Sequence, residues 1–264
     1  EDLLSTLPPG ISTVMFTCTG SEANDLALKI AKLASGGTGV IVTTNAYHGV
    51  TTEVGLVSPS LGGTDSVADW VRMVEPDGLR EGVPAAIADL AARGIRPAAL
   101  IVDTILASDG VYPEIDGLAD AVAAVRAAGG LFIADEVQPG FGRLGTGMWG
   151  FERYELVPDI VTVGKPMGNG QPIAAMMARP ELVDEFNRHS RYFNTFGGSS
   201  VSIAAAQATL DVLRDEGLIA NAASVGAHLL DELRALGAFS EVRGAGLFIG
   251  AQLESEARAL QVVN

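Results

Sequence analysis

The feature that most constrains this chain is a pair of short apolar runs that each end in reactive side chains. The first run, residues 131–134, follows two glycines and ends at Asp135 and Glu136. The second run, residues 160–163, leads through one glycine to Lys165. Continuous apolar runs of this length are typical of buried parallel strands. Because open α/β sheets bind ligands at the carboxyl ends of their strands, we predict an α/β fold with a ligand site where these runs end.

Lys165 stands out because the chain has only three lysines, and the other two, Lys29 and Lys32, lie in one helical stretch. Lys165 instead precedes residues 166–172, which are rich in turn formers and predict a loop. Burial at a strand end would lower the pKa of the amine and suit it to Schiff-base chemistry. The structural alternative is a lysine that extends from the strand end into solvent. This residue alone does not decide between the two.

The composition excludes several classes of partner. Of the 264 residues, 48% are hydrophobic and 19% are charged, and the formal net charge is −15. So acidic a surface repels phosphate backbones and anionic lipids, so we expect neither nucleic-acid nor membrane partners. The single cysteine, Cys18, precludes an internal disulfide, which favours a cytoplasmic location. We predict no metal site.

Two further segments predict ligand contacts near the start of the chain. Residues 12–17 read as a strand that leads into Gly20 and Ser21 and then a helix from Leu26 to about residue 34. A glycine and a hydroxyl at a helix N-terminus bind anions well. Plain helix capping is the commoner use of such residues, and Glu22 stands three residues after Thr19 as in a capping box. The strand predicted at residues 39–43 is followed by Tyr47, whose ring could stack on a flat ligand.

The remaining chain predicts alternating helices and strands. We expect helices at residues 83–94, 116–128, 180–189 and 200–214, a long helix to residue 236, and strands at 98–103, 173–178 and 242–253. Residues 50–69 are turn-rich and read as irregular. We find no internal repeat and no low-complexity linker.

Two nucleotide-binding alternatives do not fit. Residues 140–145 match G-x-G-x-x-G, but the residues that follow them do not begin a helix as a dinucleotide site requires. The apolar run at residues 131–134 and the two acids after it match the Walker B strand of nucleotide hydrolases. The Walker A motif of those enzymes, G-x-x-x-x-G-K-[ST], does not occur in the chain.

The motifs together resemble those of the class III (subgroup II) aminotransferases, pyridoxal-phosphate enzymes of fold type I. DEVQPGFGRLG at 135–145 and VTVGKPMGNGQP at 161–172 carry the resemblance, which extends from TGSEAN at 19–24 to VRGAGLFIGAQL at 242–253. Within the family, these motifs and FNTFGG at 193–198 look most similar to the branch of alanine–glyoxylate aminotransferase 2 and ethanolamine-phosphate phospho-lyase.

The resemblance implies a mostly parallel central sheet flanked by helices in a large domain, residues 1–214, and the start of a small α/β domain at 215–264. An N-terminal segment and the end of the small domain are missing relative to the family. We therefore expect these residues to be part of a longer protein.

The resemblance also implies that the cofactor is pyridoxal 5′-phosphate and assigns roles around its ring. Lys165 would hold the cofactor as an internal aldimine and then move the substrate's α-proton. Asp135 would lie against the pyridine nitrogen. Tyr47 and Val137 would pack on opposite faces of the ring, and Gln138 would lie near the phenolic oxygen.

By the same resemblance, Gly20, Ser21 and Thr195 would bind the cofactor phosphate. Thr195 would reach the phosphate of a neighbouring subunit, which implies a homodimer with its active site at the subunit interface. The roles of His48 and Asp103 stay open.

The predicted activity is transfer of an amino group from an amine or amino acid to a keto acid. One departure puts exchange with glutamate in doubt: Ser108 stands where ω-aminotransferases carry the glutamate that pairs with a switching arginine. A phospho-lyase acting on an amino-alcohol phosphate is the alternative with the same cofactor. A catalytically silent binding protein of this fold is the alternative of another class.

Overall fold

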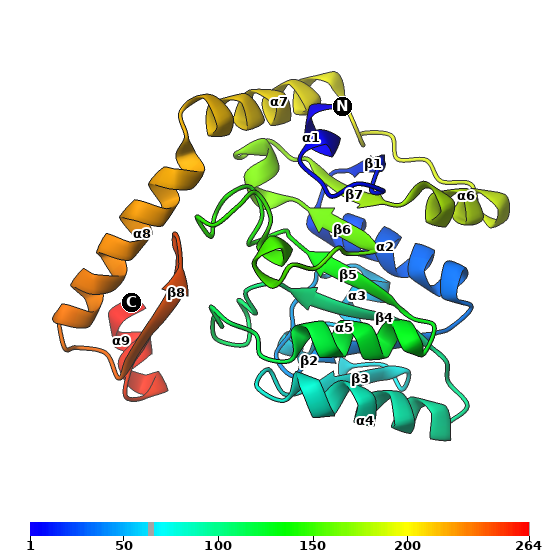
Figure 1. Ribbon diagram of the computed structural model, residues 1–264, viewed down its shortest axis with the longest axis horizontal. Coiled ribbons are helices and arrows are strands. Elements are labelled where there is room, and N and C mark those ends of the chain that lie inside the picture. The colour runs from blue at the N-terminus through cyan, green and yellow to red at the C-terminus, as the bar shows by residue number, and fades with distance from the viewer. Residues whose placement is uncertain (63–65, 264) are drawn as a thin grey trace.

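The body of the protein is one seven-stranded sheet. The computed structural model describes residues 1–62 and 66–263. The strand order is β1-β7-β6-β5-β4-β2-β3 (Figure 1). Neighbouring strands from β6 to β3 run parallel, whereas β7 is antiparallel to both β6 and β1. The mostly parallel sheet confirms the predicted α/β class. Its strands are β1 (Thr13–Thr17), β2 (Gly39–Thr43), β3 (Val71–Val74), β4 (Pro97–Asp103), β5 (Leu131–Asp135), β6 (Ile160–Val163) and β7 (Ala174–Ala178).

Helices cover both faces of the sheet, as the uninterrupted apolar strands require. In β5, Phe132 and Ala134 pack into the core beneath α4 (Leu79–Ala92) and α5 (Leu118–Ala127), while Ile133 packs into the core beneath α2 (Gly20–Ser35) and α6 (Pro180–His189). The two layers of helix are visible on either side of the sheet in Figure 1. Burial on both faces fixes the strand ends, and therefore the site, in a rigid position.

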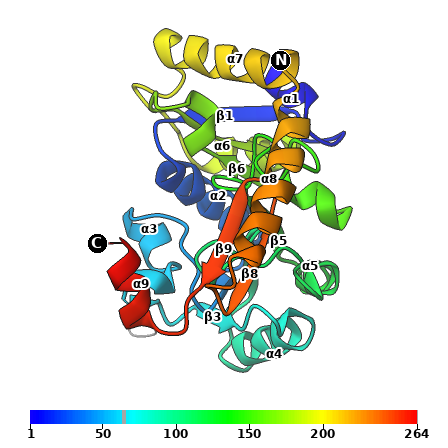
Figure 2. The same cartoon turned by 90° about the vertical axis from the view of Figure 1, so that its left-hand side faces the viewer.

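The last fifty residues leave the sheet. Helix α7 (Ser200–Asp215) is followed by α8 (Leu218–Ala235), by a hairpin of β8 (Glu241–Ala245) and β9 (Phe248–Gln252), and by α9 (Glu256–Val263). Figures 1 and 2 show α8 and the hairpin beside the edge toward which the arrows of β4, β5 and β6 point. The predicted domain boundary coincides with the end of α7, and the division into two domains stays a prediction. None of the described helices is long and apolar enough to cross a membrane.

The structure corrects five local expectations. Residues 242–253 form a hairpin and not one strand, because Gly246 adopts φ 53° and turns the chain. Helix α2 begins at Gly20, six residues before the predicted start. The described part of 50–69 contains a helix, α3 (Thr52–Gly55), and a 3-10 turn; residues 63–65 lie outside the description. Strand β3 was not predicted, and the predicted loop at 166–172 begins within the 3-10 helix η4 (Lys165–Gly168).

Candidate functional site

A cavity of about 180 Å³ lies at the carboxyl ends of β4, β5 and β6. The residues that line it are Gly20, Ser21, Tyr47, His48, Gly49, Asp103, Asp135, Val137, Gln138 and Lys165. Seven of the eight residues assigned by resemblance therefore share one cavity, although they come from four separate segments of the chain. The eighth, Thr195, is not among the lining residues.

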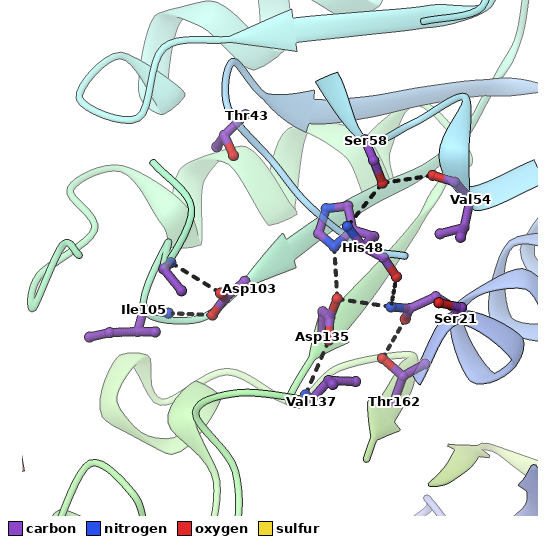
Figure 3. Close-up of polar contacts among 12 residues, drawn as sticks. Ser21, Thr43, His48, Val54, Ser58, Asp103, Ile105, Asp135, Val137 and Thr162 are labelled. Carbon is purple, nitrogen blue, oxygen red and sulfur yellow. Dashed lines mark hydrogen bonds and ion pairs between the residues drawn. The ribbon is translucent and has the colours of Figure 1, made fainter. Parts of the chain in front are cut away.

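Asp135 is the fixed point of this cavity. The last residue of β5, it is only 4% exposed. Its Oδ2 atom accepts a hydrogen bond from Asn24 Nδ2 at 2.9 Å and lies 2.8 Å from His48 Nδ1, while its Oδ1 accepts from the Val137 amide at 3.1 Å (Figure 3). A buried carboxylate is stable only when such donors compensate its lost hydration. The three donors hold Asp135 in one orientation at the floor of the cavity.

His48, left open by the sequence, belongs to this floor. It is 4% exposed, and its amide donates to Ser58 Oγ at 3.0 Å, so backbone and ring are both fixed (Figure 3). Because a carboxylate can only accept, Nδ1 carries the hydrogen that the pair shares. The other ring nitrogen, Nε2, is buried and has no hydrogen-bond partner within residues 1–62 and 66–263. The contact with Asp135 favours a role for His48 in positioning that carboxylate.

Asn24 is the functional candidate that sequence reasoning missed. It lies one turn into α2, is 1% exposed, and uses one amide nitrogen to donate both to Asp135 and to the His48 carbonyl, the latter at 2.8 Å. Its Oδ1 accepts from the Thr162 hydroxyl of β6 at 2.6 Å. An asparagine on the apolar face of a helix is costly unless every polar atom is bonded. The position of Asn24 on the apolar face of α2 was the feature of the sequence that could have identified it as a candidate.

The start of α2 forms a tight cradle beside the floor. Thr19 and Glu22 make the predicted capping box, with Glu22 N donating to Thr19 Oγ1 at 3.2 Å and Thr19 N donating to Glu22 Oε2 at 3.0 Å. A Cβ atom on Gly20 would lie 2.9 Å from Val137 Cγ1, and one on Gly49 would lie 2.5 Å from Ser21 Oγ. Glycine alone allows both close approaches, which leave backbone amides near the cavity.

Lys165 and Tyr47 occupy the rim and not the floor. Lys165 lines the cavity but is exposed, so the desolvation expected of it is not seen in this chain. The physical reason is its position: it follows β6 by two residues and opens the short helix η4, beyond the buried end of the strand. Tyr47 is 37% exposed. Thr195 is also exposed, between Phe193 and Phe196, which are 86% and 71% exposed.

Two further carboxyl groups lie near the floor. Asp103, at the end of β4, pairs in register with Asp135, and its two oxygens accept from the amides of Ile105 and Ala107 at 3.1 and 3.0 Å. Burial, with the nearby charge of Asp135 as the second cause, raises the pKa of Asp103 to about 7. Asp103 therefore changes its charge near neutral pH, at the edge of the cavity.

Glu136 does not line the cavity. Fully buried, it accepts from Thr104 Oγ1 at 2.7 Å and from the amides of Gly150 and Phe151 at 2.7 and 3.0 Å. Burial raises the pKa of Glu136 to about 8 against the opposing effect of these hydrogen bonds. Its role is structural: it anchors the loop that follows Asp135 to the end of the sheet.

Comparison with known proteins identifies the family. The sequence model of the family described as aminotransferase class-III matches residues 1–264. The chain belongs to the class III aminotransferases. It is 40% identical, over 97% of its length, to alanine–glyoxylate aminotransferase 2 homolog 2, mitochondrial, of Arabidopsis thaliana. It is 37% identical, over 96% of its length, to ethanolamine-phosphate phospho-lyase homolog 1 of Caenorhabditis elegans. These relatives confirm the predicted branch of the family.

A solved structure agrees. A phospholyase from Arthrobacter in complex with phosphoethanolamine superposes with a TM-score of 0.88 at 39% identity, covering 93% of this chain and 63% of that one. This confirms the fold type I architecture of this class III chain. The chain spans 57% and 62% of the lengths of the Arabidopsis and Caenorhabditis relatives.

Class III aminotransferases use pyridoxal 5′-phosphate, and the cavity of this member suits that cofactor. Its floor carries a buried carboxylate for a protonated ring nitrogen, and its rim carries the amine of Lys165. The cradle at Gly20 and Gly49, which a Cβ atom would fill, leaves room for a phosphate beside the N-terminus of α2. The cavity lining thus includes an acid, an amine and backbone amides at a helix N-terminus, which are the kinds of group that can contact a ring nitrogen, an aldehyde and a phosphate.

Proposed function

We propose that this chain forms the cofactor-binding body of an aminotransferase that moves an amino group from an amine or amino acid to a keto acid. One observation carries the proposal: Lys165 and Asp135, from the ends of two paired parallel strands, line the same cavity. An amine and a fixed acid that line one small cavity suit a cofactor that has polar groups for both.

Each of these residues has a distinct task. Pyridoxal 5′-phosphate, when bound, supplies an electron sink for the charge left when a proton leaves the amine-bearing carbon. The Lys165 amine would hold the cofactor covalently and, once the substrate's amine has displaced it, would accept and return that proton. Asp135, fixed by Asn24 and His48, would keep a proton on the ring nitrogen by its charge.

Contacts around the ring and the phosphate complete the proposed site. Val137, 8% exposed, would pack on one face of the ring and Tyr47 on the other. Gln138 would lie near the phenolic oxygen. The amides of Gly20 and Ser21 at the start of α2 would bind the phosphate.

We propose that Thr195 contributes to the phosphate site of a second copy, so that the protein is a homodimer. The exposure of Thr195 and of the flanking Phe193 and Phe196 supports an interface at this segment. Sedimentation of the protein with Phe193→Ser, which should shift the assembly toward the single chain, tests the proposal. The cytoplasmic location stays a prediction from composition, since the Arabidopsis relative is named as mitochondrial.

The experiment that tests the function compares Lys165→Ala with Lys29→Ala. Lys29 is exposed on α2 and contacts Phe186, away from the cavity. We expect Lys165→Ala to lose the visible absorbance that borohydride removes from the parent protein, together with turnover. Lys29→Ala should retain both. Full turnover in Lys165→Ala would refute the mechanism.

A second candidate, a phospho-lyase, is favoured by a specific observation. Ser108 stands exposed in the turn after β4, where the ω-aminotransferases that the chain resembles carry the switching glutamate. The Arthrobacter structure is that of a phospholyase with phosphoethanolamine. Supplying O-phosphoethanolamine with and without a keto acid separates the two functions. Phosphate release without an acceptor supports the lyase, and amino transfer that requires the acceptor supports the aminotransferase. A bound cofactor without either reaction supports the silent binding protein.

A further inference from the structure

The turn after β4, residues 104–112, reaches across to the loop that follows β2. Asp109 in this turn accepts a hydrogen bond from the Thr43 hydroxyl at 2.6 Å and another from the Asn45 amide at 2.8 Å. The turn also carries Ser108, where this chain departs from the ω-aminotransferases that it resembles. Asp109 is not among the residues that line the cofactor cavity. Any effect of Asp109 on the cavity must therefore pass through the two groups that it binds.

The loop that Asp109 binds is the one that carries Tyr47 to the cavity. Thr43 is the last residue of β2, and the chain beyond it leaves the sheet. Tyr47 lines the cavity and is 37% exposed. On its far side, both the amide and the ring of His48 are hydrogen-bonded. On its near side, Asp109 binds the Asn45 amide and the Thr43 hydroxyl through separate oxygen atoms, which fixes the loop against the turn. Tyr47 therefore lies between two anchored points.

The turn that carries Asp109 is itself held in place. Leu106 and Val111 adopt φ of 49° and 65°, a conformation that residues other than glycine keep only where their surroundings hold them in it. Arg243 of β8 supplies part of that hold, because its Nε donates to the carbonyls of Gly110 and Val111 at 2.7 and 2.9 Å. The Val111 side chain is also buried in a small apolar cluster. Asp109 is thus presented by a fixed support and not by a free loop.

We propose that Asp109 is a positioning residue for the cofactor ring, because it fixes the loop that places Tyr47 on the face of the ring. The inference rests on the proposed function, in which Tyr47 packs on the ring, and deepens it by naming the residue that holds Tyr47 there. Without Asp109, the Asn45 amide and the Thr43 hydroxyl would exchange their partner for water, and the loop would gain conformational freedom. Cofactor binding would then have to order the loop, which lowers the affinity.

Hydrogen exchange in the cofactor-free protein tests whether Asp109 holds the loop. The exchange rate is read by mass spectrometry from peptides that span residues 43–48. In Asp109→Ala we expect these amides to exchange at least about tenfold faster than in the parent protein, while unchanged exchange in β5 shows that the fold is intact. Asp184→Ala, exposed on α6, is the matched control and should leave both rates unchanged. Parental exchange of residues 43–48 in Asp109→Ala would overturn the proposal.

Two conservative variants isolate the hydrogen bonds. Asp109→Asn can keep both contacts, because its Oδ1 accepts from the Asn45 amide and its Nδ2 donates to the Thr43 oxygen. Its exchange should stay within about twofold of the parent, and exchange as fast as in Asp109→Ala would overturn the proposal. Thr43→Val removes only the hydroxyl and should speed exchange about threefold. If Asp109→Ala does not fold, Thr43→Val decides the question, and unchanged exchange in that variant is the result against the proposal.

Titration of the cofactor-free protein with pyridoxal 5′-phosphate tests whether the hold acts through Tyr47. In Asp109→Ala we expect the dissociation constant of the cofactor to rise about threefold to fivefold. In a Tyr47→Ala background the same substitution should change it by less than about 1.5-fold, because no ring remains to be positioned. A merely structural role for Asp109 would weaken binding equally in both backgrounds, and that result would overturn the proposal.

Failure of the inference differs from failure of the proposed function. If Asp109→Ala binds the cofactor as tightly as the parent protein does, the proposed function stands and Asp109 has no positioning role. If the parent protein binds no pyridoxal 5′-phosphate, the proposed function fails. The exchange measurement needs no cofactor, so it still decides whether Asp109 holds residues 43–48 in place.

Discussion

The floor and the rim of the cavity differ in how completely this chain satisfies their polar groups. On the floor, Asp135, Asn24 and His48 are at most 4% exposed and bonded to one another. On the rim, Lys165 is exposed and makes no ion pair with any described residue. The floor is fixed by folding alone, whereas the rim keeps its charged groups available to ligands.

This difference follows from where the residues lie. Asp135 and Asn24 of the floor come from a strand end and from α2, which are packed in the core, and His48 comes from a buried part of the loop after β2. Rim residues come from loops and from the short helix η4. A buried donor or acceptor that loses its partner costs free energy, whereas an exposed one exchanges its partner for water. Substitutions on the floor should therefore affect stability as well as function, and substitutions on the rim should affect function alone.

Asn24→Ala is expected to have the largest effect, and it tests whether substitutions on the floor destabilise the fold more than substitutions on the rim. The change removes the side-chain amide that donates to both Asp135 and the His48 carbonyl, and it leaves the Thr162 hydroxyl without its acceptor. We expect the free energy of unfolding to fall by about 2–3 kcal/mol and cofactor affinity to fall with it, because Asp135 loses a donor. Urea denaturation followed by tryptophan fluorescence, with and without cofactor, measures both changes.

Two controls frame that result. Asn187→Ala, exposed on α6, and Lys165→Ala, on the rim, should each change the free energy of unfolding without cofactor by less than about 0.5 kcal/mol. If Asn24→Ala lowers the free energy of unfolding no more than these two variants do, the hydrogen bonds of the floor do not stabilise the fold. The proposed difference between floor and rim would then be wrong.

A smaller effect should appear in the dependence of stability on pH. In the folded chain burial raises the pKa of Glu136 from 4.5 to about 8. An acid with a raised folded pKa stabilises the fold fully below its unfolded pKa, and this contribution is lost as the pH rises through the folded pKa. We therefore expect the free energy of unfolding to decrease between pH 5 and pH 8. Asp103, with a pKa of about 7, adds to the same decrease.

Glu136→Gln isolates this contribution. The amide cannot ionise, so the decrease between pH 5 and pH 8 should become shallower. At pH 5 the variant should be less stable than the parent by about 1–2 kcal/mol, because the new Nε2 donor faces backbone donors such as the Gly150 amide. Denaturation midpoints at four pH values measure the slope. Glu232→Gln, exposed on α8, is the control, and a slope as steep in Glu136→Gln as in Glu232→Gln would contradict the assignment.

The sequence predicted what depends on local pattern. The apolar runs that became β5 and β6 are strands because they can be buried on both faces, and the acid and amine follow directly at their ends. The spacing of Thr19 and Glu22 predicted the capping box, because its two partners are only three residues apart in the chain. In these cases the residues that determine the structure are neighbours in the chain.

What depends on distant contacts was not predicted. His48 stayed open because its partner, Asp135, is 87 residues away, and Asn24 was missed because it is 111 residues from the same carboxylate. The sequence also left open whether Lys165 is buried or extends into solvent, since it places the lysine after a buried strand but does not show that η4 carries it past the strand end. Local pattern alone left plain helix capping as an alternative at the start of α2 and a solvent-extended side chain as an alternative for Lys165. The site residues were assigned only through the resemblance to a family.

The smallest effect is expected from Tyr47→Phe, which sharpens the description of the rim. The Tyr47 ring lines the cavity, while its hydroxyl has no hydrogen-bond partner among residues 1–62 and 66–263. Removing the hydroxyl should therefore change the dissociation constant of the cofactor by less than about twofold, whereas Tyr47→Ala removes the stacking ring and should raise it about threefold to tenfold. Fluorescence titration with pyridoxal 5′-phosphate measures both constants. Equal losses in the two variants would mean that the hydroxyl binds the cofactor, and Tyr47 would then belong with the hydrogen-bonded residues of the floor.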